Sequence, residues 1–141
     1  KLSPHYWKSR MAAMKRMIED KDPDVICFQE LLYPASRYVP STYRRVGLSI
    51  SHHIYVKKGM KVKKHRFGIH YERADVEGVR IFCVHGTWTA AAVDTLCKYL
   101  TDNLPVAGTA IVAGDFNTFD FGKLILAIFV PLLLIYIYLI S

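Results

Sequence analysis

Residues 109–117, Thr-Ala-Ile-Val-Ala-Gly-Asp-Phe-Asn, read as a short apolar strand that runs directly into a polar turn. A brief apolar run closed by glycine is typical of a buried strand. Asp115 and Asn117 stand two residues apart just after it. Ligands and catalytic groups collect where rigid strands meet loops, so this pair is a candidate site. The plain alternative is a simple turn, because Asp and Asn both favour turns.

Two further predicted strands also finish on a polar side chain. Residues 24–29 read Asp-Val-Ile-Cys-Phe-Gln and are followed by Glu30, and residues 79–85 read Val-Arg-Ile-Phe-Cys-Val-His and end on His85. Taken singly, Glu30 could be a solvated strand end and His85 a hydrogen-bonded core histidine. Taken together, the three strand ends predict one polar cluster at one edge of a sheet.

Two helices are expected around these strands. Ser3-Pro4 is a helix-start signal, and apolar side chains at three- and four-residue spacing over 6–20 predict a helix that Asp22-Pro23 ends. Residues 89–103 predict a second helix with one apolar face. The mixture of helices and strands indicates an α+β fold, or a layered α/β fold, without repeats.

The middle of the chain predicts a loop and a hairpin. Residues 31–45 contain two prolines and several polar residues, so we expect an exposed loop there. Residues 48–57 and 61–71 are expected to pair as a hairpin that turns at Lys58-Gly59. The neighbours His52 and His53 would face opposite sides of a strand and could not easily share one metal ion.

The charge pattern indicates an anionic partner. Lysine and arginine total 19 against 12 acids in 141 residues, and residues 31–71 contain nine basic residues and no acid. A solvated, lysine-protected edge is the plain alternative for this stretch, and anionic lipid headgroups are another possible partner. We expect phosphate contacts from six side chains within it: Lys57, Lys58, Lys61, Lys63, Lys64 and Arg66.

Composition bounds the class of protein. Hydrophobic residues make up 52% and charged residues 22% of the chain, which excludes a disordered or collagen-like chain. The length fits one domain of ordinary size. The three cysteines are odd in number and form no CxxC pair, so no disulfide partner is expected and a reducing compartment fits best.

Residues 124–140, LILAIFVPLLLIYIYLI, form an uncharged apolar run. Such a run is long enough to span a bilayer as a helix, so we divide the chain into a domain over 1–122 and a hydrophobic tail over 123–141. The basic domain would then lie on the cytoplasmic side of the membrane. The alternatives are a buried helix or a pair of core strands, with the protein in the cytoplasm.

Three segments carry a resemblance to a known family: 23–30 (PDVICFQE), 77–85 (EGVRIFCVH) and 113–118 (AGDFNT). Their residues and order resemble the endonuclease/exonuclease/phosphatase superfamily, the Mg²⁺-dependent phosphodiesterases related to DNase I. The resemblance implies a partial β-sandwich flanked by helices, Mg²⁺ or Mn²⁺ as cofactor, and a phosphate-containing substrate, either nucleic acid or an inositol phosphate.

The same resemblance implies roles for four residues. Glu30 would bind the metal ion, and His85 would bind the scissile phosphate or assist the leaving oxygen. Asp115 would orient or deprotonate the attacking water, and Asn117 would hold the phosphate oxygens.

Two features of the family have no counterpart in these residues, namely a first-strand asparagine and a final aspartate–histidine pair. We therefore expect a domain truncated at both ends, of reduced activity, whose open sheet edges favour self-association. The alternative function is a non-catalytic, membrane-anchored module that binds nucleic acid or anionic lipid through the basic hairpin.

Overall fold

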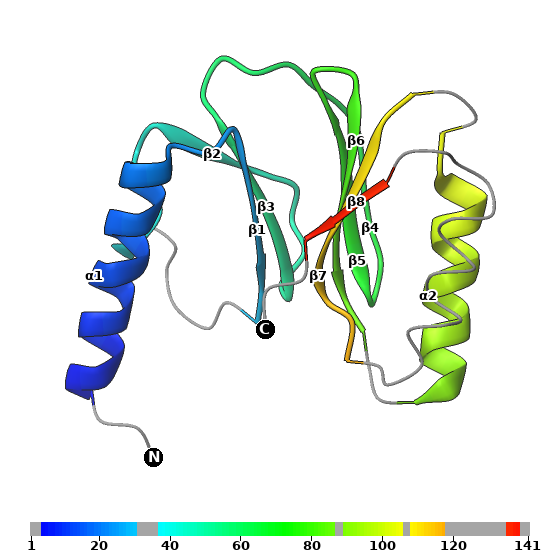
Figure 1. Ribbon diagram of the computed structural model, residues 1–141, viewed down its shortest axis with the longest axis horizontal. Helices are drawn as coiled ribbons and strands as arrows, with labels where there is room; N and C mark the ends of the chain where they lie inside the picture. The colour runs from blue at the N-terminus through cyan, green and yellow to red at the C-terminus, as the bar shows by residue number, and fades with distance from the viewer. Residues whose placement is uncertain (1–3, 31–36, 87–88, 106–107, 118–134, 139–141) are drawn as a thin grey trace.

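A computed structural model of the chain describes residues 4–30, 37–86, 89–105, 108–117 and 135–138 (Figure 1). These residues form two helices and eight strands, in the order α1 (Pro4–Lys21), β1 (Val25–Gln29), β2 (Tyr43–Val46), β3 (His52–Lys57), β4 (Val62–Phe67), β5 (Tyr71–Val76), β6 (Val79–His85), α2 (Ala90–Asn103), β7 (Ala110–Asp115) and β8 (Ile135–Tyr138). The expected mixture of α and β elements is confirmed.

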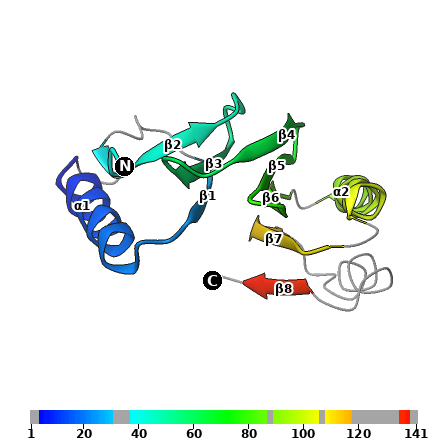
Figure 2. The ribbon, with the colours of Figure 1, turned by 90° about the horizontal axis from the view of Figure 1, so that it is seen from above.

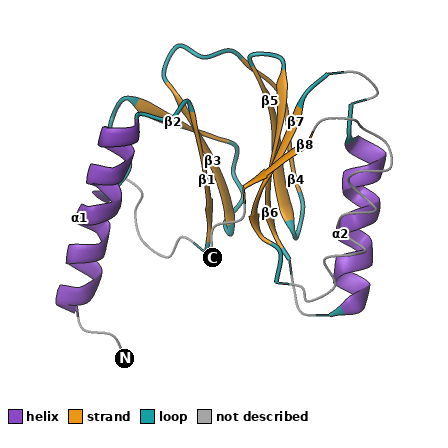
Figure 3. Ribbon diagram, viewed as in Figure 1, coloured by secondary structure: helices purple, strands orange, loops and turns teal. Residues whose placement is uncertain are grey.

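The elements stack as four layers, helix on sheet on sheet on helix (Figures 1, 2 and 3). One sheet has the order β1-β3-β2 and is antiparallel throughout. The other has the order β4-β5-β6-β7-β8, antiparallel up to β6 and parallel from β6 to β8. Helix α2 makes the crossover that the parallel β6–β7 pair requires.

Strand β6 is apolar almost without interruption because both of its faces are buried. Ile81 and Cys83 face the first sheet and pack with Ile54 and Val56 of β3. The alternate residue Phe82 joins a second core on the other face, against α2. A central strand covered on both faces needs apolar side chains on both, and each large one that is buried stabilises the fold by about 1.5–3 kcal/mol.

A third core lies between α1 and the first sheet. Ile18 is buried there against Tyr38, Tyr43 and Tyr55. The buried stripe of α1 is narrower than the sequence predicted, because Met17 is 58% exposed.

The expected exposed loop over 31–45 is wrong in its second half. Tyr38, Val39 and Tyr43 are buried beneath α1, and β2 begins at Tyr43. The Tyr43 hydroxyl donates a hydrogen bond to the Pro23 carbonyl (2.6 Å), which draws this segment into the core. Residues 31–36 lie outside the described part of the chain.

The expected hairpin at Lys58-Gly59 is also wrong. Strand β3 pairs with β1 and β2, whereas β4 pairs with β5 in the other sheet, so the turn carries the chain from one sheet to the next. Strand β3 is buried on both faces and suits the centre of a sheet, while the basic, exposed β4 suits an edge. The expected strand over 61–71 is two strands joined by a turn at Gly68, whose N–H donates to the Tyr71 carbonyl (2.9 Å).

The tail departs from the expected transmembrane helix where it is described. Residues 135–138 form β8, which pairs in parallel with β7 from Ala110↔Ile135 to Ala113↔Tyr138. Among the described residues, no helix combines the length and the apolar character needed to cross a membrane. Residues 118–134 and 139–141 lie outside the described part.

We predict that removing residues 124–141 destabilises the domain, because it takes away β8 and leaves one edge of β7 without a partner. At about 1 kcal/mol for each lost hydrogen bond, the free energy of unfolding should fall by about 2 kcal/mol in urea denaturation. A chain lacking only 139–141 is the control. Unchanged stability of the longer deletion would contradict a structural role for the strand and favour a membrane anchor.

Candidate functional site

The carboxyl ends of β1, β6 and β7 meet at one edge of the sandwich, which we call the polar edge. His85 and Asp115 are register partners at the ends of two parallel strands, and the Gly86 N–H donates to the Asp115 carbonyl (2.7 Å). Glu30, just past the end of β1, places its carboxylate 3.6 Å from Nε2 of His85. The structure thus brings together Glu30, His85 and Asp115.

Asn117 ties the loop after β7 to the loop after β6. Its side-chain amide donates to the Gly86 carbonyl (3.1 Å), and its backbone N–H donates to Oδ1 of Asp115 (2.9 Å). Asp115 is exposed, so its second carboxylate oxygen remains available to water or a ligand. Asn117 therefore joins the same cluster, and it also orients Asp115.

Two glycines allow this close approach of backbones. Gly114 has φ +147°, and a Cβ there would lie 1.9 Å from the Val84 carbonyl oxygen. A Cβ on Gly86 would lie 2.0 Å from the Phe116 carbonyl oxygen. A larger residue at either position would force β6 and β7 apart and separate His85 from Asp115.

Glu30 is the residue of this cluster best suited to a metal ion. Its side chain is 72% exposed, and its backbone N–H donates to the Ser51 carbonyl (3.0 Å). The described residues contain no group of three or more His, Cys, Asp or Glu that could hold a metal. Mg²⁺ is commonly held by one or two carboxylates, with water and substrate phosphate filling its other positions. A single exposed carboxylate at the polar edge fits that ion.

A buried histidine lies beneath the exposed cluster. His52 is 1% exposed, its ring centroid lies 6.0 Å from that of His85, and its Nδ1 lies 2.9 Å from the Ser51 hydroxyl. Burial, helped by the neighbouring His85 and His70, lowers the pKa of His52 to about 4. The ring is therefore neutral near pH 7 and supports His85 without adding positive charge. His53 faces the other side of β3, as its position predicted.

Sequence reasoning missed Glu72, which joins the two sheets beside the polar edge. Its fully buried carboxylate accepts hydrogen bonds from the Ile54 N–H (2.8 Å) and from His65 Nε2 (3.0 Å). Burial raises the pKa of Glu72, although the two hydrogen bonds oppose the shift. The sequence does contain a pattern that predicts its burial. Glu72, Ala74 and Val76 are alternate residues of one strand, so their side chains point to the same inner face of the sheet.

The six basic candidates separate into two groups. Lys57 is engaged at the α1–β1 corner, where its Nζ lies 2.9 Å from Asp22 and 3.2 Å from Asp24. The other five are exposed on the turn after β3 and along β4: Lys58, Lys61, Lys63, Lys64 and Arg66. Strand β4 reaches the polar edge with its Phe67 end, since Phe67 pairs with Glu72 and the next residues lead to Tyr71, the partner of Val84.

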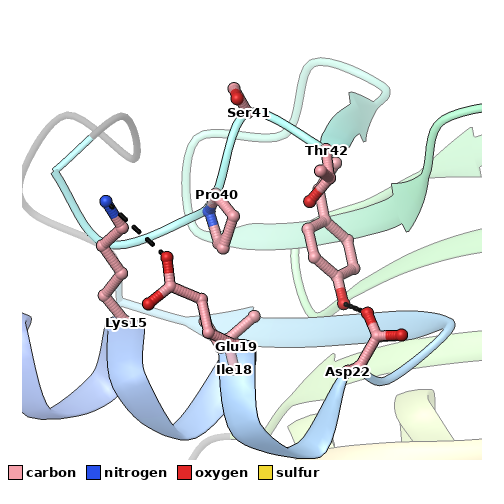
Figure 4. Close-up of a pocket in the computed structure, with 8 residues that line it drawn as sticks. Lys15, Ile18, Glu19, Asp22, Pro40, Ser41 and Thr42 are labelled. Carbon is pink, nitrogen blue, oxygen red and sulfur yellow. Dashed lines mark hydrogen bonds and ion pairs between the residues drawn. The ribbon is translucent and has the colours of Figure 1, made fainter.

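A pocket of about 310 Å³ lies at the opposite end of the molecule, near the start of β1 (Figure 4). Its polar groups pair with one another: Lys15 with Glu19 (3.8 Å), and the Tyr43 hydroxyl with Asp22 (3.5 Å). This pocket belongs to the packing of α1 on the first sheet and is not part of the polar edge. Its lining residues are Lys15, Ile18, Glu19, Asp22, Pro40, Ser41, Thr42 and Tyr43.

We predict that His52 makes stability depend on pH. Its folded pKa of about 4 lies below the ordinary 6.5, so the unfolded chain takes up a proton in this interval before the folded chain does. The free energy of unfolding should therefore fall, by up to roughly 3 kcal/mol, as the pH drops through that window. Urea denaturation at several pH values measures it.

The test variant is His52→Asn, which has no titratable ring. Its side-chain amide can replace Nδ1 in the hydrogen bond with the Ser51 hydroxyl. This variant should show a shallower dependence than the parent chain. The raised pKa of Glu72 acts with the opposite sign above 4.5 in both chains, so the difference between them isolates His52. Equal slopes would show that His52 is not held neutral.

Comparison with known proteins agrees with this fold. The family model described as "Endonuclease/Exonuclease/phosphatase family" matches residues 2–123. No curated protein sequence matches the chain.

Solved structures with the same fold include an AP endonuclease from Archaeoglobus fulgidus, at 15% identity and a TM-score of 0.56 over 77% of this chain and 52% of that one. TDP2 from Caenorhabditis elegans is similar at 19% identity and a TM-score of 0.51, over 71% of this chain and 38% of that one. The chain thus spans about half the length of the first and less of the second. The match over residues 2–123 confirms the resemblance drawn from the three strand-end segments, and the chain belongs to the endonuclease/exonuclease/phosphatase family.

Proposed function

We propose that this chain is a phosphodiester- or phosphomonoester-hydrolysing domain in which water attacks phosphorus with the help of a divalent metal ion. The observation that supports this most is the meeting of Glu30, His85 and Asp115 at one edge of the sandwich, in a member of this family. The similar solved structures are an AP endonuclease and TDP2, which makes a nucleic-acid phosphodiester the first candidate substrate. An inositol phosphate is the second.

Three residues of the polar edge have separate roles in this reaction. Asp115 uses one carboxylate oxygen to accept the Asn117 N–H, which leaves the other to orient the attacking water and take its proton. His85, with neutral His52 behind it, binds a phosphate oxygen. Asn117 adds amide polarity beside the same position.

Glu30 would hold the metal ion, Mg²⁺ or Mn²⁺. When bound, such an ion polarises the phosphoryl oxygen and lowers the pKa of bound water. The Glu30 carboxylate lies 3.6 Å from Nε2 of His85, so the group that would hold the metal and the group that would bind phosphate are neighbours.

We further propose that turnover by these residues alone is slow. Residues 86–141 contain no histidine, so no imidazole there could share the proton transfer with Asp115. A second positioned acid or base would contribute about 10²–10⁴-fold. A non-catalytic, phosphate-binding module is the second candidate, and the exposed basic residues of β4 favour it.

We expect Mg²⁺-dependent cleavage of plasmid DNA or of bis(p-nitrophenyl) phosphate that falls to background in Asp115→Asn, because the water loses its base. Asp94→Asn, an exposed carboxylate change on α2, is the matched control and should behave like the parent. Glu30→Gln should raise the Mg²⁺ concentration needed for half-maximal rate by about tenfold or more.

Two results would contradict these roles. Equal rates for Asp115→Asn and the parent chain would remove Asp115 from the reaction. Salt-sensitive binding of phosphate compounds without any metal-dependent turnover would favour the non-catalytic candidate.

A further inference from the structure

Four exposed apolar side chains flank the polar edge, and we call them the apolar rim. Leu48 (81% exposed) and Ile50 (92%) come from the loop between β2 and β3. Phe67 (54%) and Ile69 (85%) come from the end of β4 and the turn into β5. The rim therefore draws on one loop from each sheet.

Backbone hydrogen bonds join both loops directly to site residues. The Glu30 N–H donates to the Ser51 carbonyl (3.0 Å), one residue from Ile50. The His85 N–H donates to the His70 carbonyl (3.0 Å), one residue from Ile69. Whatever contacts the rim must therefore lie close to Glu30 and His85.

The loop that carries Leu48 and Ile50 is held in place by its polar groups. Arg45 donates to the Ser49 carbonyl, the His52 N–H donates to the Ser49 hydroxyl (3.2 Å), and a ring nitrogen of His53 donates to the Ile50 carbonyl (3.2 Å). These three hydrogen bonds fix the loop backbone, whereas the side chains of Leu48 and Ile50 are exposed. Their exposure is thus built into the loop, which reduces the entropy lost when a partner binds.

The loop after β2 also lies against strand β4, which leads into the second loop. A Cβ added to Gly47 would lie 1.8 Å from Nε2 of His65, and His65 is bonded to Glu72 across the sheets. Gly47 has φ +80°, so a glycine is needed both for the turn and for this contact. The rim is therefore one surface made of two braced loops.

The charge around the rim is positive. Residues 31–71 contain no acid, and Lys64 and Arg66 are exposed on β4 toward its Phe67 end. Two exposed acids, Glu30 and Asp115, lie at the polar edge itself. Apolar tips within a basic surface complement a partner that is anionic outside and apolar beneath.

We propose that the apolar rim docks on an anionic lipid bilayer, with Leu48, Ile50 and Ile69 entering the interface and the basic residues of β4 contacting headgroup phosphates. Three of the four rim side chains are aliphatic. Such side chains gain free energy by leaving water for hydrocarbon, whereas nucleic-acid bases stack best on aromatic rings. Docking in this way turns the polar edge toward phosphates at the membrane surface.

Docking depends on the rim alone. Its consequence, that membrane-borne phosphates are the substrate class, rests on the proposed function.

Co-sedimentation with vesicles tests the docking. The full chain should bind phosphatidylcholine vesicles that contain about one-third phosphatidylserine, and bind pure phosphatidylcholine more weakly. The double variant Leu48→Ser/Ile69→Ser should bind the anionic vesicles at least about tenfold more weakly, since each apolar side chain loses its transfer free energy. Met17→Ser, an exposed apolar change on α1, should bind like the parent.

The basic contribution has its own pair of variants. Lys64→Gln/Arg66→Gln should weaken binding to anionic vesicles by about tenfold and flatten its salt dependence. Arg16→Gln, on exposed α1, is the control. Circular dichroism and urea denaturation establish that each variant is folded before its binding is compared.

Two results would overturn the proposal directly: no binding of the parent chain to anionic vesicles, or equal binding by the parent and the rim variant. A third would be a parent chain that does not bind vesicles, together with a rim variant that binds short duplex or single-stranded DNA more weakly than the parent. The last would assign the rim to nucleic acid. Vesicle binding needs no turnover, so a failed hydrolysis assay leaves the docking test intact.

Discussion

The parallel pairing of β6 with β7 is the constraint on which the rest of the structure depends. Its register sets His85 opposite Asp115, and it requires the crossover helix α2 that covers the outer face of the second sheet. The pairing also brings the loops after both strands so close that Gly86 and Gly114 have no room for a side chain. The site and one of the three cores thus follow from a single pair of strands.

The polar edge depends in turn on buried polar groups between the sheets. His52 lies neutral beneath His85, and the Glu72 carboxylate links the Ile54 backbone to His65. Each would destabilise the fold if it lost its partners, because an unsatisfied buried polar group costs about 1–3 kcal/mol. In exchange they keep the ends of the two sheets in register, where apolar packing alone would allow them to slide.

The local sequence pattern was enough to predict where the strands end, but it did not predict which strands pair with each other. Glu30, His85, Asp115 and Asn117 each follow an apolar run, and such runs are visible in a short window of sequence. The turn at Lys58-Gly59 shows that the chain changes direction, but not that β3 and β4 lie in different sheets, because pairing is decided by distant partners. Residues 135–138 depart from the expected helix for a related reason: an uncharged run suits a bilayer or a buried strand equally well, and the pairing of β8 with β7 distinguishes them where the chain is described.

Backbone conformation adds a final argument for the site. Among the described residues, Glu30 and Asn117 are two of five non-glycine residues with positive φ, at +51° and +45°. Asparagine tolerates this left-handed region, but glutamate gains nothing from it and is held there by the hydrogen bond from its N–H to Ser51. A glycine at position 30 would relieve the strain and lose the carboxylate. Glu30 thus combines a strained backbone with an exposed carboxylate beside His85, and strained positions of this kind are common at functional sites.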